Sequence, residues 1–140
     1  MYCNLNDQPD VLIYNYEVLS RSGTRFKMPF SRFSKSSTQL ANTFFNAAWT
    51  KAIKTKKLKK FLEGCMRGED TYMWLQVLDG DPSIKQIEDC LYIYRMHGKN
   101  ITFSSVFQED RKTFINALKK MLPGVKDKWV ALSIRERCGL

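Results

Sequence analysis

Residues 68–78 read GEDTYMWLQVL, a glycine and two acids followed by a largely apolar stretch, and they decide the fold. Four apolar residues recur here at helical spacing: Tyr72, Met73, Leu75 and Leu78. This pattern predicts a helix from Glu69 to Leu78. Its acids, Glu69 and Asp70, occupy the first turn, where free amide groups and the helix dipole stabilise negative charge.

Strand-like segments flank this helix in the sequence. Asp10–Leu19 begins with a continuous apolar run, which is typical of a strand covered on both faces. A turn at Ser22-Gly23 allows Thr24–Phe30 to return as a short strand that ends at Pro29. Ile84–Met96 alternates apolar and polar residues over its second half and is predicted to be a long strand.

Further helices are expected on both sides of these strands. Thr38–Phe45 has helical spacing, and Thr55 is a suitable cap for a short helix over Lys56–Glu63. In that short helix a buried stripe is expected: Leu58, Phe61 and Leu62. A long helix with a capping box at Ser105 is predicted up to Pro123-Gly124, and a second helix over Asp127–Arg137.

A second informative stretch, residues 91–102, reads LYIYRMHGKNIT. Together with the acidic helix, and with AAWTK at residues 47–51, it resembles the acceptor-side half of family 2 glycosyltransferases of the GT-A type. The likeness extends from Asp10 to about Thr102. It implies a partial GT-A-like mixed sheet with flanking helices, and a strand over Ala47–Ile53 in which Trp49 is buried and Lys51 points outward.

The resemblance also implies an activity, the transfer of a sugar from a nucleotide-sugar to an acceptor hydroxyl. Asp70 would be the general base that takes the hydroxyl proton, with Glu69 beside it in the catalytic pair. Arg95 and His97 would border the donor phosphates. Three further residues would contact the acceptor: Trp74, Tyr94 and Lys51.

The donor half of such an enzyme, with its nucleotide-binding strands and Asp-x-Asp metal motif, has no counterpart in these residues. A divalent metal, Mn²⁺ or Mg²⁺, is therefore expected only together with that half, which a second chain would supply. Asp79-Gly80-Asp81 has the Asp-x-Asp spacing, but turn chemistry accounts for it, so no metal is assigned.

Each of these residues also has a structural interpretation. Glu69 and Asp70 are favourable first-turn acids in any helix. Trp49 is a core residue by default, because buried aromatic rings are commoner than sugar-stacking ones. A lone histidine such as His97 is more often a local hydrogen-bonding residue than a ligand.

Charge is distributed unevenly along the chain. Eleven Lys or Arg and no Asp or Glu occur from Val18 to Leu62, while the whole chain has a net charge of +9. Such a segment attracts polyanions. We therefore expect an anionic acceptor, which could be a glycan, a lipid-linked glycan or nucleic acid. The alternative function is a non-catalytic basic protein that binds nucleic acid or a protein partner.

Length and composition are those of one globular domain. The predicted strands and helices make its fold class α/β. Residues 1–103 are expected to form the glycosyltransferase-like unit, with residues 104–140 as a C-terminal helical pair packed on it. The four cysteines are scattered, which favours reduced thiols. The sequence predicts a cytoplasmic protein, with a peripheral position at an anionic membrane face as an option.

Overall fold

The computed structural model describes residues 8–28, 33, 35, 48–66, 68–97 and 107–140. They form a mixed α/β structure with one four-stranded sheet. The strands are β1 (Val11–Leu19), β2 (Arg25–Lys27), β3 (Lys51–Ile53) and β4 (Ile84–Arg95). The helices are α2 (Glu69–Asp79), α3 (Phe107–Met121) and α4 (Lys128–Cys138).

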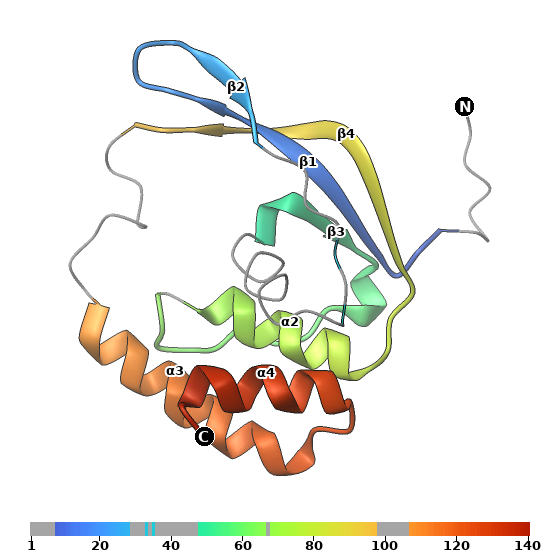
Figure 1. Cartoon of the computed structure of the whole chain (residues 1–140), viewed down its shortest axis with the longest axis vertical. Coiled ribbons are helices and arrows are strands. Elements are labelled where there is room, and N and C mark those ends of the chain that lie inside the picture. The colour runs from blue at the N-terminus through green and yellow to red at the C-terminus, as the bar shows by residue number, and fades with distance from the viewer. Residues whose placement is uncertain (1–7, 29–32, 34, 36–47, 67, 98–106) are drawn as a thin grey trace.

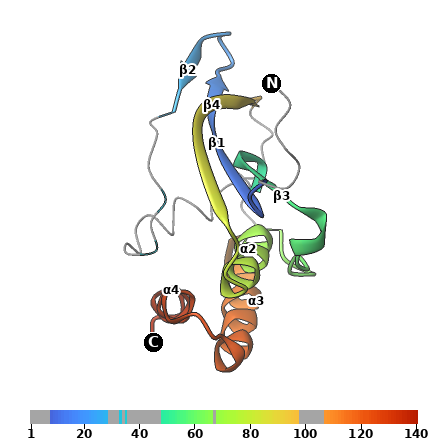
Figure 2. The same cartoon turned by 90° about the vertical axis from the view of Figure 1, so that its right-hand side faces the viewer.

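The sheet is built around β1. β4 pairs with β1 in parallel along its whole length, from Val11 opposite Ile84 to Leu19 opposite Arg95. The other edge of β1 is shared by two antiparallel strands, β3 against its first residues and β2 against its last. The helices gather near the beginning of β1 and β4, and the β1–β2 hairpin extends away from them (Figures 1 and 2).

Several predicted elements are confirmed. The strands expected over Asp10–Leu19 and Ile84–Met96 are β1 and β4, and the short returning strand is β2. The acidic helix is α2, and the two C-terminal helices are α3 and α4, the latter capped by Asp127 through the amides of Trp129 and Val130. The helix expected over Thr38–Phe45 lies outside the described residues, as does the capping residue Ser105.

Helix α2 is the centre of the core. It lies between the sheet and the pair α3–α4 (Figure 1). Six of its side chains are therefore buried rather than a single stripe: Thr71, Met73, Trp74, Leu75, Val77 and Leu78. Val11 and Ile13 of β1, Leu118 of α3, and Val130 and Ile134 of α4 complete the cluster. No helix in the described part of the chain is long and apolar enough to cross a bilayer.

A carboxylate joins the end of α2 to the start of α4. One oxygen of Asp79 accepts the backbone N–H groups of Lys126 and Asp127, both at 2.7 Å. Asp127 in turn caps α4 and accepts a hydrogen bond from the amine of Lys35 at 2.8 Å. Asp81, at the other end of the Asp-Gly-Asp turn, has a positive φ of 45° and an exposed side chain. The turn therefore fixes helix geometry.

Two predictions about residues 47–63 are wrong. Residues Ala48–Thr50 form a 3₁₀ turn, so the strand is confined to Lys51–Ile53. The helix expected over Lys56–Glu63 is absent from this described segment: a 3₁₀ turn covers Thr55–Lys57, and Leu58 is already extended. Its expected stripe is not buried either, since Leu58 and Phe61 are each 46% exposed. A short helix has little intrinsic stability without an apolar surface to cover.

The orientation of two side chains also differs from expectation. Lys51 is buried, with 7% of its surface exposed, and Trp49 is only partly buried. The sheet register explains Lys51. It pairs with Ile13, and antiparallel partners place their side chains on the same face. Ile13 faces the core beside α2, so Lys51 does too.

Gly68 precedes the first residue of α2 and has a backbone conformation that other residues rarely adopt. Its φ is +86°, and a Cβ there would lie 2.8 Å from the Phe114 ring. Gly68→Ala is expected to lower the free energy of unfolding by about 2–3 kcal/mol, through backbone strain and this contact. Urea titration measures it. Gly23→Ala is the matched control, because Gly23 has the same φ and open space around it. Equal losses in the two variants would contradict a role for Phe114.

Candidate functional site

Lys51 is the most unusual charged residue of the described chain. Its amine donates a hydrogen bond to the hydroxyl of Thr50 at 3.0 Å and lies 5.5 Å from the ring centroid of Trp74. Burial lowers the pKa of Lys51 to about 7, and the negative charge of Asp70 opposes this effect. The amine is therefore poised between its charged and neutral forms near neutral pH.

Asp70 lies in the first turn of α2, where its Oδ1 accepts the N–H of Thr71 at 2.7 Å. Its side chain is partly exposed, unlike that of Lys51. The Asp70 charge also acts on Arg137 of α4, whose pKa is lowered by burial while Asp70 and Glu136 oppose the change. One carboxylate thus interacts electrostatically with cations from β3 and α4.

Glu69 occupies a different environment one residue earlier. Burial raises the pKa of Glu69, and the nearby charges of Asp70 and Asp110 add to the effect. Among the described residues, its Oε2 is buried and has no hydrogen-bond partner. Asp110 of α3 is itself buried, and its carboxylate accepts the N–H of Met66 at 3.3 Å. The two acids of the predicted pair therefore differ: Glu69 has a buried oxygen without a hydrogen-bond partner, whereas an oxygen of Asp70 accepts the N–H of Thr71.

The predicted site residues fall into two groups. Lys51, Asp70 and Trp74 are brought together at the junction of β3 and α2, with Glu69 next to them. Trp74 is 1% exposed and belongs to the core, so its ring forms a wall beneath Lys51 rather than an open platform. A sugar could therefore not stack on Trp74 in this arrangement.

Tyr94 belongs to an aromatic cluster on the sheet. The Trp49 ring stacks on Tyr94 at 5.0 Å and on Tyr92 at 4.7 Å, and Tyr16 meets its edge at 4.7 Å. The hydroxyl of Tyr14 donates to the carbonyl of Trp49 at 2.7 Å. These contacts fix the 3₁₀ turn that precedes Lys51 against the sheet, which gives Tyr94 a positioning role in the fold.

Arg95 and His97 lie at the far end of the sheet. Lys51 pairs with Ile13 of β1, whereas Arg95 pairs with Leu19, six residues further along that strand. At about 3.3 Å per residue the two levels are about 20 Å apart. Figure 1 likewise shows the end of β4 well away from α2. The structure thus separates Arg95 and His97 from Asp70, whereas the resemblance implies that all three residues lie at the reacting groups.

The residues present do not fit a divalent metal. No group of three or more His, Cys, Asp or Glu side chains in the described part of the chain could hold an ion. Asp79 is occupied by two backbone amides, and Asp81 is exposed near the amine of Lys35. No step that depends on a metal is therefore derived from these residues.

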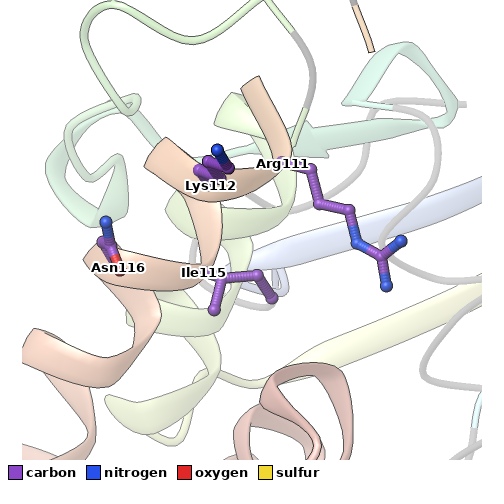
Figure 3. A pocket seen from close by; sticks show the side chains of 4 residues that line it. All are labelled: Arg111, Lys112, Ile115 and Asn116. Carbon is purple, nitrogen blue, oxygen red and sulfur yellow. The ribbon is translucent and has the colours of Figure 1, made fainter. Parts of the chain in front are cut away.

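A surface hollow of about 510 Å³ opens beside α3, separate from the Lys51–Asp70 group (Figure 3). The residues that line it come from one face of that helix: Arg111, Lys112, Ile115 and Asn116. Their cationic ends are exposed and no carboxylate is among these lining residues. This chemistry allows an anion to rest there but does not provide a general base.

Sequence reasoning missed Arg137 and Asp110 as members of the group around α2. Each comes from a helix far from α2 in the sequence, and neither forms part of a motif. The only signal is indirect, because a charged residue near the apolar stripe of a packed helix is a candidate for burial.

Comparisons with protein-family models, with curated proteins and with solved structures return no match to this chain.

Proposed function

We propose that this chain is the acceptor-binding part of a glycosyltransferase of the family 2 type, with Asp70 as general base. The observation that carries the proposal is the position of Asp70. Asp70 is a partly exposed residue in the first turn of α2, and its negative charge acts on both Lys51 and Arg137. The likeness of residues 47–51, 68–74 and 91–102 to that family supports the same assignment.

The reaction follows from the chemistry of the carboxylate. Asp70 takes the proton of the acceptor hydroxyl as the oxygen forms a bond to the anomeric carbon. The bond between that carbon and the diphosphate breaks with inversion, and the nucleoside diphosphate leaves. Lys51 interacts electrostatically with Asp70 but is too buried to reach the acceptor, so its role is to set the electric field at the carboxylate.

Donor binding is assigned to a partner. The described residues include no nucleotide-binding strands and no group of side chains that could hold a metal ion. The nucleotide-sugar and its Mn²⁺ or Mg²⁺ would therefore be held by a second chain. Because Arg95 and His97 lie about 20 Å along the sheet from the level of Lys51, a direct contact of both with the donor phosphates would need that partner to extend across the sheet face.

The test is made where the partner is present, in extracts of cells that encode this chain. Chromosomal Asp70→Asn is expected to lower the transfer of one radiolabelled sugar, supplied in a panel of nucleotide-sugars with Mn²⁺, by about 100-fold or more. Asp89→Asn is the matched control, since Asp89 is an exposed acid on β4. Equal chain levels and unfolding temperatures exclude a folding effect. Unchanged transfer of every sugar in Asp70→Asn extracts would overturn the proposal.

A further inference from the structure

Residues 54–62, KTKKLKKFL, form what we call the lysine segment, and two of its three large apolar side chains face solvent. Leu58 and Phe61 are each 46% exposed, and Met66 just beyond is 54% exposed. Figure 2 shows the part of the chain between β3 and α2 standing out on the side opposite α4. Large apolar groups displayed in this way mark an interaction surface rather than a core.

The backbone of the lysine segment is held in place. The N–H of Lys54 bonds to the carbonyl of Asp10 at 3.0 Å, and the amines of Lys54 and Lys57 lie 3.6 and 3.3 Å from the Asp10 carboxylate. At the other end, the side chain of Gln76 on α2 donates to the carbonyl of Lys60 at 3.0 Å. The exposed side chains are thus presented by a fixed stretch of backbone.

Three more lysines surround the exposed apolar pair. Lys56, Lys59 and Lys60 are exposed, and no carboxylate of the described residues lies within ion-pair distance of their amines. The ion-pair partners of Asp10 are Lys54 and Lys57, so its single negative charge does not act directly on the other three lysines. The segment therefore combines clustered positive charge with apolar side chains, and any partner must be complementary to both.

Anionic lipid satisfies both requirements better than nucleic acid does. Basic residues bind favourably to a membrane that contains anionic lipid. Apolar side chains add to the binding by entering the boundary between headgroups and acyl chains. Nucleic acid would attract the lysines and could stack on Phe61, but it offers nothing to Leu58, which has no aromatic face. The exposure of Leu58 decides between the two.

We propose that the lysine segment binds the surface of bilayers that contain anionic phospholipid. Leu58 and Phe61 insert at the headgroup boundary, and Lys56, Lys59 and Lys60 lie against the phosphates. The inference does not depend on sugar transfer, because it concerns binding by the chain alone. It brings the chain that leads into α2, which begins at Glu69 after residues 63–68, toward the lipid surface.

Co-sedimentation of the purified chain with vesicles tests this proposal. Binding is expected to phosphatidylcholine vesicles that contain phosphatidylglycerol, but not to phosphatidylcholine alone, and added salt should weaken it. Each lysine at such a surface contributes about fivefold in affinity, so the double variant Lys59→Glu/Lys60→Glu should bind at least about 30-fold more weakly. The double variant Leu58→Ser/Phe61→Ser should lose about tenfold or more.

Matched controls separate the segment from general effects of charge and exposure. Lys119→Glu/Lys120→Glu makes the same charge change at exposed positions of α3, and Leu132→Ser removes a side chain that is 47% exposed on α4. Both should retain most of the binding. Circular dichroism confirms that each variant is folded.

A second measurement reports depth. The single variant Phe61→Trp should show quenching by brominated lipid in anionic vesicles, measured against the unsubstituted chain as the background from its own tryptophans. Equal binding to neutral and anionic vesicles, or full binding by Leu58→Ser/Phe61→Ser, would overturn the proposal. The proposal would also be overturned if Lys59→Glu/Lys60→Glu kept its binding to anionic vesicles and lost binding to a DNA oligonucleotide. That result would identify a nucleic-acid surface.

Discussion

The free energy of unfolding should rise by up to about 1.4 kcal/mol per pH unit as the pH increases from 7 toward 10. Lys51 is the cause. Burial lowers its pKa in the folded chain to about 7, against an ordinary value of 10.5. Between these values the unfolded chain holds a proton that the folded chain has released. The unfavourable effect of burying the ammonium group is complete below pH 7 and disappears as the pH approaches 10.5.

Urea titrations at several pH values from 7 to 9 measure this slope. The upper limit avoids Tyr14 and Tyr16, whose pKa values are raised by burial above the ordinary 10.0 and which therefore reduce stability at higher pH. Lys51→Met is the control, because it fills a similar volume and cannot titrate. The slope should be absent from that variant. The same slope in both proteins would show that Lys51 does not carry the effect.

Trp74→Ala is expected to lower the free energy of unfolding by about 3–5 kcal/mol, a large part of the total for a domain of this size. The Trp74 ring is 1% exposed and is the largest of the fully buried side chains described in the structure. Its removal leaves a cavity in the core next to the middle of α2 and takes away the aromatic face beside the Lys51 amine.

Thermal and urea denaturation measure the loss, with Leu132→Ala as an exposed control expected to change stability by less than about 0.5 kcal/mol. A double variant with Lys51→Met adds a second test. Because Lys51 and Trp74 are in contact, their effects should be non-additive. Additive losses would contradict the contact between Lys51 and Trp74. A loss in Trp74→Ala no larger than that of the control would contradict the burial of Trp74 in the core.

Much of the fold follows from local patterns in the sequence. The apolar run of β1, the alternation in β4 and the spacing of Met73, Leu75 and Leu78 each specify an element that the structure contains. Asp127 is a capping residue at the position where α4 begins. These signals act over a few residues, so they are readable without knowledge of what packs against them.

The burial of Lys51 and the shape of the lysine segment depend on distant partners. Only the pairing of Lys51 with Ile13 turns its side chain toward α2. Leu58, Phe61 and Leu62 have the spacing of a helix stripe, but the backbone there is not helical, and the side chain of Gln76 donates a hydrogen bond to the carbonyl of Lys60. The separation of Arg95 from Asp70 is equally a matter of strand register, which a motif does not encode.

The parallel pairing of β1 with β4 has a consequence for how the chain reaches this structure. The hydrogen bonds that join Asp10 and Ser83, where the two strands begin, connect residues 73 positions apart. Closing so long a loop delays productive folding. On the ribosome, β1 emerges well before β4, and of its described partner strands β2 and β3 alone are present until Ile84 is synthesised. The backbone edge of β1 that β4 later covers is then open to other chains. We therefore expect yields of native protein to improve at low temperature and low nascent-chain concentration.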